Sequence, residues 1–316
     1  SQGGDGGQIE TSGAKLNTAA IQVDASAQVS QGKAGLWLID PYDYVIDSTA
    51  ATNIVNALNA GASGTSVEVT TQADSANYGS AGSGTGNITV RSAINATGAA
   101  DLSLTADGTV TLNAPVSVGG NVSITTTGLS GTGGIALGDN KTLTVNQSGN
   151  STYSGAISGT DASLVKQGAG ALTLSADHSY TGSTTISDGA LQVGNGGATG
   201  SLATSNVVNN GNLVFYTGSD KAIPYAISGT GSVEVKGGEY TIFNNYLTTN
   251  NQTIATGTTV LDVLERIAGG QQGGLYINCV AGTCGTIPAG AYNKKYDPST
   301  NTATFQIQTY FYGGPT

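Results

Sequence analysis

Residues 164–194 read "LVKQGAGALTLSADHSYTGSTTISDGALQVG" and contain four short segments in which apolar and polar residues alternate. Alternation with a period of two is typical of a strand that buries one face and exposes the other. The segments are separated by Gly, Asp, Ser and Asn, which favour turns. This stretch therefore predicts short strands joined by tight turns.

The same pattern recurs along the chain at a nearly constant spacing. One series of apolar positions recurs about every 21 residues. It comprises Leu102, Val122, Leu143, Leu164, Ile186, Val207 and Ile227. A second series has nearly the same step and comprises Val23, Val45, Val67, Ile88 and Val110. A fixed period sustained over most of the chain indicates a repeat protein.

A strand of four or five residues cannot bury its apolar face alone, but stacked copies can, because each backbone pairs with the next. A unit of about 21 residues has room for three short strands and three turns. We therefore predict an all-β fold, a right-handed parallel β-helix with Val, Ile, Leu and Ala inside and Thr, Ser, Asn and Gln outside. A β-sandwich or meander is the competing interpretation, and it would need hairpin signals.

Composition narrows the possible partners. Only 9% of the 316 residues are charged, and the formal net charge is −10. A surface of that sign repels phosphate backbones and anionic lipid heads, so we expect no nucleic-acid partner. The longest apolar clusters, such as residues 34–39, are far shorter than the roughly 20 residues of a membrane span, so we expect no membrane insertion. The many β-branched residues argue against a disordered chain.

The chain has no Met and two cysteines, Cys279 and Cys284. We expect a processed product or a fragment from which any secretion signal has been removed. A single C-x4-C pair in a chain of this composition favours a small extracellular disulfide. A zinc site would need four ligands, and the single histidine, His178, is remote in sequence.

The sequence offers little catalytic chemistry. We expect the turn aspartates to bond their own backbone; they are Asp107, Asp139, Asp161, Asp177, Asp188 and Asp220. A Ser-His-Asp triad could be built only around His178, and sequence neighbours rarely have triad geometry, so we expect His178 to be a solvated turn residue. We predict no catalytic residue, no cofactor and no metal site.

The regular spacing fails after about residue 250. Residues 258–270 predict the only convincing helix, with Thr259 and Asp262 as a capping pair and Gly269 at its end. Residues 302–312 alternate and follow a turn at 296–302, so a hairpin is expected. The outward positions of this strand form a possible binding or assembly face, comprising Gln306, Gln308, Tyr310 and Tyr312. Packing of this face on the adjacent rung is the alternative.

Residues 164–194 resemble the strand repeat of bacterial autotransporter passengers. The matching positions are Lys166, Gly168, Gly170, Leu172, Leu174, Tyr180, Gly182, Thr184, Ile186, Gly189 and Leu191. Residues 7–47 are similar to filamentous-haemagglutinin-like exoproteins secreted by a two-partner route. The positions that fit are Val23–Ser26, Gly32, Gly35, Trp37, Asp40, Pro41 and Asp43.

These resemblances imply a secreted bacterial adhesin with a β-helical fold on the surface of a Gram-negative bacterium. We expect a β-helix over residues 1–250, with haemagglutinin-like rungs at 1–100 and autotransporter-type repeats at 101–250, and a C-terminal cap at 251–316. The leading hypothesis is a non-catalytic stalk that attaches to a glycan or protein receptor on a host or bacterial surface. Alternatives are a subunit of a fibre that binds itself head to tail and, less favoured, a polysaccharide-processing enzyme.

Overall fold

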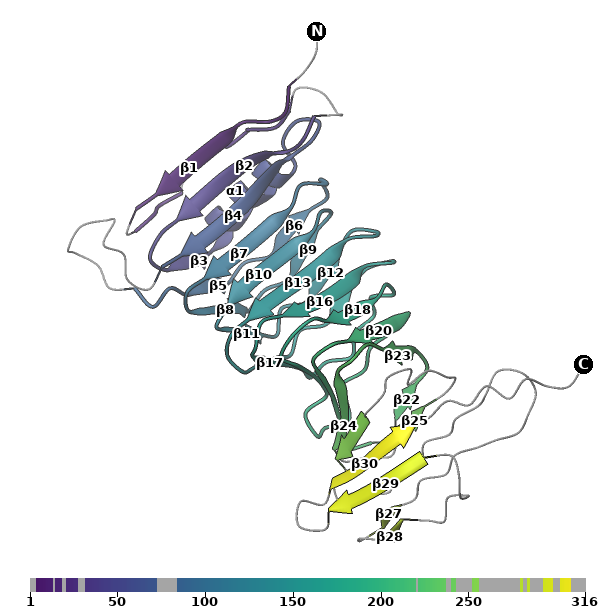
Figure 1. Ribbon diagram of the computed structural model, residues 1–316. Helices are drawn as coiled ribbons and strands as arrows, with labels where there is room; N and C mark the ends of the chain where they lie inside the picture. Colours follow the sequence, from purple (N-terminus) through teal and green to yellow (C-terminus); the bar gives the residue numbers. More distant parts are fainter. Residues whose placement is uncertain are drawn as a thin grey trace, which may run out of the picture.

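The computed structural model describes residues 4–13, 15–18, 21–27, 32–72, 84–219, 221–236 and 240–242, together with five C-terminal strands between residues 252 and 307. The strands of three sheets stack along one direction, and the chain passes from one sheet to the next in each turn of the coil (Figure 1). The coil is right-handed and all its pairings between rungs are parallel. The predicted parallel β-helix is therefore confirmed.

Three sheets form the walls of this solenoid. Sheet 1 has ten strands, in the order β1 (Gln8–Ser12), β2 (Gly35–Asp40), β4 (Thr65–Thr71), β7 (Leu102–Ala106), β10 (Val122–Thr126), β13 (Thr142–Gln147), β16 (Ser163–Gln167), β18 (Thr184–Ile186), β20 (Asn206–Asn209) and β23 (Ala226–Ser228). Sheet 2 has nine, in the order β3 (Tyr44–Ile46), β5 (Ile88–Val90), β8 (Thr109–Leu112), β11 (Gly128–Gly131), β14 (Ser151–Tyr153), β17 (Ala171–Leu174), β19 (Ala190–Val193), β21 (Asn212–Tyr216) and β24 (Ser232–Lys236). Sheet 3 has four, β6 (Ile94–Ala96), β9 (Val116–Val118), β12 (Ile135–Leu137) and β15 (Ile157–Ser158).

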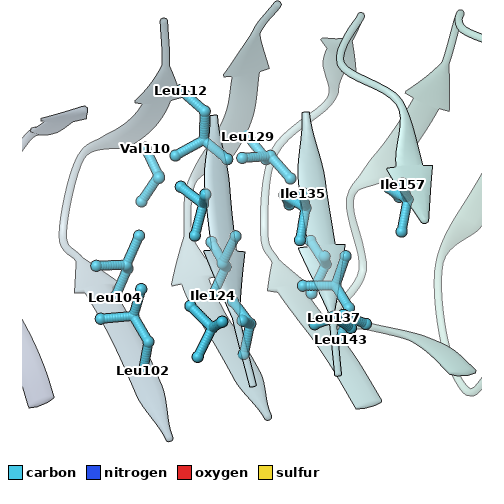
Figure 2. Close-up of a cluster of buried hydrophobic side chains, with 14 of the residues drawn as sticks. Leu102, Leu104, Val110, Leu112, Ile124, Leu129, Ile135, Leu137, Leu143 and Ile157 are labelled. Atoms are coloured by element: carbon cyan, nitrogen blue, oxygen red, sulfur yellow. The ribbon is translucent and has the colours of Figure 1, made fainter. Parts of the chain in front are cut away.

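The core lies between the three sheets. Leu102, Ile124 and Leu143 of sheet 1 point toward Leu129 of sheet 2 and Ile135 of sheet 3 (Figure 2). All five side chains are buried, none exposing more than 1% of its surface. Like side chains therefore stack above one another, as the alternation of the sequence predicts, and burial of apolar surface stabilises each added rung.

The series that begins at Leu102 is largely the observed ladder. Leu102, Val122, Leu143 and Leu164 are register partners in succession, and the ladder ends with Val207 and Ile227. At β18 the predicted position was wrong, because Thr184 rather than Ile186 pairs with Leu164 and Val207. Ile186 is buried at the next inward position of this strand, between Lys166 and Asn209.

The series that begins at Val23 is mostly wrong. Val45 is 42% exposed and pairs with Thr89, and Val67 belongs to sheet 1, where it pairs with Trp37 and Leu102. Only the last step, from Ile88 to Val110, is a true register pair. The early rungs of sheet 1 are longer than the predicted period, because the partners Trp37 and Val67, and then Val67 and Leu102, lie much further apart along the chain.

A helix that the sequence analysis missed explains the first of these long rungs. Helix α1 (Ser48–Leu58) follows β3 in the place where later rungs have a strand of sheet 3, and it contacts β3, β4 and β6. Asp47 caps it by accepting hydrogen bonds from the backbone N–H groups of Thr49 and Ala50. Ile54 and Leu58 are fully buried, so α1 covers the open edge of β6 and belongs to the core.

The remaining strands form small sheets. Strand β22 (Lys221–Ile223) pairs in parallel with β25 (Tyr240–Ile242). Strands β29 (Tyr292–Asp297) and β30 (Thr302–Ile307) are antiparallel, so the predicted pairing on either side of the turn is confirmed, and β26 (Gln252–Ala255) adds to β30. Strands β27 (Cys279–Val280) and β28 (Thr283–Cys284) form a separate antiparallel pair. The helix predicted at 258–270 lies outside the described residues.

Within the described part of the chain, no helix has the length and apolar character needed to cross a membrane. The boundary predicted between a solenoid and a C-terminal cap at residue 250 stays a prediction.

The ladder through Leu143 gives a test of the register. Leu143→Asp places a carboxylate between Val122 and Leu164, in a position with no exposed surface, and should lower the free energy of unfolding by several kcal/mol, about 3 to 5. Thr144→Asp, one residue on and facing outward, should change it by less than about 1 kcal/mol. Urea unfolding of the two variants measures both values, and similar losses at the two positions would contradict the register.

Candidate functional site

The outer face of sheet 1 carries no charged side chain over seven consecutive strands, from β7 to β23. Its outward residues are Ser103, Thr105, Ser123, Thr125, Thr142, Thr144, Asn146, Ser163, Val165, Gln167, Thr185, Asn206, Val208, Ala226 and Ser228. With rungs about 4.8 Å apart, this face extends over roughly 29 Å. We call it the neutral face. It offers mainly hydroxyl and amide groups, with three apolar side chains among them.

Several acidic side chains lie at the turns, where they join successive rungs. Asp101 Oδ1 accepts from the backbone N–H of Asn121 at 2.7 Å, and Asn121 Oδ1 accepts from that of Thr142 at 3.0 Å. Asp43 accepts from the backbone N–H groups of Thr85 and Asn87 in the same way, and these hydrogen bonds help to lower the pKa of its carboxyl even though burial alone would raise it.

The prediction that turn aspartates bond their own backbone was therefore only partly right. Asp188 accepts from the N–H of the adjacent Gly189 at 2.7 Å. Asp177 accepts from the N–H of Gly200 and the hydroxyl of Ser201, on the following rung, and Lys221 Nζ lies 3.7 Å from its carboxylate. Asp220 lies outside the described residues.

A column of buried polar side chains marks the corner between sheets 1 and 2, and sequence reasoning missed it. Its members are Thr71, Thr126, Gln147, Lys166 and Asn209, each 4% exposed or less. Each donates to backbone carbonyls around the corner: Thr126 Oγ1 to Gly108 O at 2.8 Å, for example, and Asn209 Nδ2 to Ser232 O at 2.7 Å. The column therefore supplies side-chain donors to main-chain carbonyls at this corner, so that its buried polar atoms are paired.

Lys166 is the charged member of this column. Its Nζ donates to the carbonyls of Gln167 at 2.7 Å, Gly168 at 2.8 Å and Asp188 at 3.4 Å, and the residue has no exposed surface. Burial lowers the pKa of Lys166 to about 8, and the negative charge of Asp188 opposes this shift. Gly168 has φ +74°, a left-handed conformation that favours glycine, so the lysine and the glycine shape one turn together. The alternation from Leu164 was the signal that Lys166 points inward.

His178 is buried, and the expectation of a solvated turn residue was wrong. Only 4% of its surface is exposed. Its Nδ1 accepts from the backbone N–H of Ile157 at 3.0 Å, and its Nε2 is buried with no hydrogen-bond partner. Burial lowers the pKa of His178 to about 4, against a smaller opposite effect of Asp177. No triad is assembled, since Nδ1 accepts from the main chain instead of donating to a carboxylate.

The predicted C-terminal site residues are placed only in part. Cys279 and Cys284 are register partners in the antiparallel pair β27–β28, so their backbones lie opposite each other. The disulfide between them stays a prediction. Gln306 lies in β30 opposite Asn293, whereas Gln308, Tyr310 and Tyr312 lie outside the described residues. The proposed Tyr and Gln face therefore also stays a prediction.

Among the residues that the structure describes, no group of three or more His, Cys, Asp and Glu side chains could hold a metal ion.

Together these features define a class, a right-handed β-solenoid with apolar ladders inside and uncharged polar strands outside. Residues 164–193 match the passenger-associated-transport-repeat family. The chain is also similar to the protein described as "Adhesin BmaC autotransporter" of Brucella suis biovar 1 (strain 1330), with 37% identity over 108 residues. That match covers 32% of this chain and 3% of the adhesin. No solved structure matches the chain.

These two matches confirm the predicted resemblance to autotransporter passenger adhesins. The matched repeat begins in β16 and ends with β19, so it corresponds to more than one full rung and includes both Lys166 and His178. The resemblance of residues 7–47 to filamentous-haemagglutinin-like exoproteins stays a prediction.

The contribution of Lys166 can be measured by removing its ammonium group. Lys166→Met retains much of the volume but leaves three carbonyls without their donor, so we expect the free energy of unfolding to fall by about 2 to 4 kcal/mol. Val165→Met, on the outer face of the same strand, is the control and should change it by less than about 1 kcal/mol. Chemical denaturation provides both numbers; an unchanged stability of Lys166→Met would show that the carbonyls do not depend on Nζ.

Reduction tests the predicted disulfide. Because Cys279 and Cys284 are close together in the sequence, a bond between them closes a small loop, and a reducing agent should loosen that loop alone. We expect hydrogen exchange to rise near residues 279–284 while β7 to β21 keep their protection. Loss of protection throughout the solenoid would assign the two cysteines a much larger structural role.

Proposed function

We propose that the chain is a non-catalytic passenger segment of a secreted adhesin, a rigid stalk that holds contact surfaces away from the surface of a Gram-negative bacterium. The observation that carries the proposal is the position of the passenger repeat, which lies within a continuous solenoid instead of forming a separate module. The similarity to an autotransporter adhesin supports it, although the chain spans only 3% of that protein.

Rigidity follows from the way that the rungs are joined. Every strand of sheet 1 from β2 to β20 has a hydrogen-bonded neighbour on both sides, and the apolar ladder beneath is continuous. Bending such a rod would require several ladders to open at once, which a stack of interlocked rungs resists. A stalk needs this property, since it must keep a contact surface at a fixed distance.

The neutral face is the contact surface that we propose. The chain carries 20 acidic and 10 basic residues, so its net charge opposes binding to anionic surfaces. The neutral face lacks this repulsion and presents hydroxyl and amide groups in register, which can both donate and accept hydrogen bonds. We propose an uncharged polar partner, a glycan or a protein receptor on a host or bacterial surface.

The proposed lack of catalysis rests on the positions of the acidic and histidine side chains. Asp101, Asp177 and Asp188 accept hydrogen bonds from backbone N–H groups within the fold. His178 Nδ1 accepts a hydrogen bond from the N–H of Ile157. Groups fixed in this way are structural, and proton transfer to a substrate would require them to give up those bonds.

Binding to cells and to printed neutral and acidic glycans tests the adhesive role. We expect the labelled chain to bind, and the double variant Thr125→Glu/Thr144→Glu on the neutral face to lose at least about tenfold in affinity, because two new carboxylates must be desolvated at the contact. The matched control, Thr111→Glu/Thr173→Glu, adds the same charge to the outer face of sheet 2 and should bind as before.

Equal losses in the two double variants would remove the neutral face from the proposal. Failure of the unmodified chain to bind any cell or glycan would contradict the adhesive role itself. The same glycans, incubated with the chain, should show no new reducing ends, and their appearance would contradict the non-catalytic role.

A further inference from the structure

Sheet 3 contains a regular column of backbone hydrogen bonds that joins one rung to the next. The first N–H group of each strand donates to the carbonyl of the residue just before the next strand, and the bonds are Ile94 N to Pro115 O at 3.0 Å, Val116 N to Gly134 O at 2.9 Å and Ile135 N to Ala156 O at 2.8 Å. The column reaches Ile157, the first residue of β15, which is the last strand of this sheet.

At Ile157 the acceptor changes from a carbonyl to an imidazole. The N–H of Ile157 donates to His178 Nδ1 at 3.0 Å, so the ring occupies the position that a backbone carbonyl has in the three rungs before. The backbone beside the ring is held on both sides, since Ser179 N donates to Ile157 O and His178 N donates to Ser201 O, each at 2.9 Å. His178 therefore continues this column of hydrogen bonds beyond β15, the last strand of sheet 3.

This bond depends on the charge of the ring. An imidazole nitrogen accepts a hydrogen bond only when it carries no proton, and both nitrogens are donors in the imidazolium ion. Protonated His178 would direct an N–H group at the N–H of Ile157. The other ring nitrogen does not offset the loss of this hydrogen bond, because Nε2 is buried and has no hydrogen-bond partner.

Few other titratable groups face the ring. Asp177, in the same turn, bonds the next rung and lies near Lys221 of β22, so that pair contributes little net charge. Tyr180, also in this turn, has its ring centroid 6.4 Å away and donates to or accepts from Thr184. On the rung before, Tyr153 is buried, and residues 154–158 carry no titratable side chain; on the rung after, neither do residues 199–203.

We propose that His178 is an acid-sensitive latch that fastens the rung containing β15 to the passenger repeat. Protonation of the ring releases the N–H of Ile157 and opens the seam between residues 157 and 178, while the ladders of sheets 1 and 2 stay closed. This inference concerns stability under acid and does not depend on the adhesive role.

The expected pH window follows from linkage. In the closed state burial holds the pKa of His178 at about 4, whereas in the open, solvated state it returns to its ordinary value of about 6.5. Between these values the open state binds one more proton than the closed state. Closure is therefore fully effective above pH 6.5, and the opening constant rises about tenfold for each pH unit lost below it, down to about pH 4.

Amide hydrogen exchange of the whole chain between pH 7.5 and pH 4.5 tests the latch. After correction for the intrinsic exchange rate, the protection factor of the Ile157 amide should fall by about tenfold per pH unit below 6.5. The amide of Ile135, which donates to a carbonyl in the same column, is the internal control and should keep its protection. Constant protection at Ile157, or a parallel fall at Ile135, would overturn the proposal.

His178→Asn provides a matched variant. The asparagine oxygen has the same position along the side chain as Nδ1 and accepts a hydrogen bond at every pH in the window. We expect the Ile157 amide of this variant to keep a constant protection factor from pH 7.5 to pH 4.5. A pH dependence equal to that of the unmodified chain would show that another group is responsible. The comparison of Ile157 with Ile135 in the unmodified chain holds even if this variant is unstable.

Discussion

The structure depends on parallel backbone pairing between rungs, because that pairing forces each inward side chain to lie above the equivalent side chain of the rung before. Leu102, Val122, Leu143 and Leu164 follow one another for this reason. A sequence can satisfy such a requirement only by repeating its apolar positions at the right interval. The same requirement leaves the outer positions free to vary, and from β7 to β23 of sheet 1 they are filled mainly by uncharged polar residues.

Several of the buried polar side chains in the described part of the chain bond the backbone where the chain turns or a sheet ends. Gln147 and Lys166 point inward at the corner between sheets 1 and 2, and both donate to backbone carbonyls there. His178 has the complementary role, because it accepts from an N–H group at the end of sheet 3. These three buried side chains therefore lie where the chain changes direction or a sheet ends.

The fold class could be predicted from the sequence, and so could the ladder after Leu102 except at β18, since the rungs there keep a nearly constant length and alternation identifies the inward face. Before Leu102 the same reasoning failed. Helix α1 lengthens a rung without disturbing the local strand patterns, so Val45 and Val67 matched a spacing that the structure does not use. The role of His178 could not be read from the sequence, because its partner Ile157 lies on another rung and nothing in the local pattern links the two.

The Asp and Asn side chains that bond across the turns give the rod a chemical direction. Asp101 accepts from Asn121, Asn150 from Ala171 and Asn210 from Thr230, and in each pair the acceptor precedes the donor along the chain. The two ends of any stack of rungs are consequently unlike, one offering carboxylate and amide oxygens and the other offering main-chain N–H groups. A rung joined to such an end in the reverse orientation would place side-chain oxygens against side-chain oxygens.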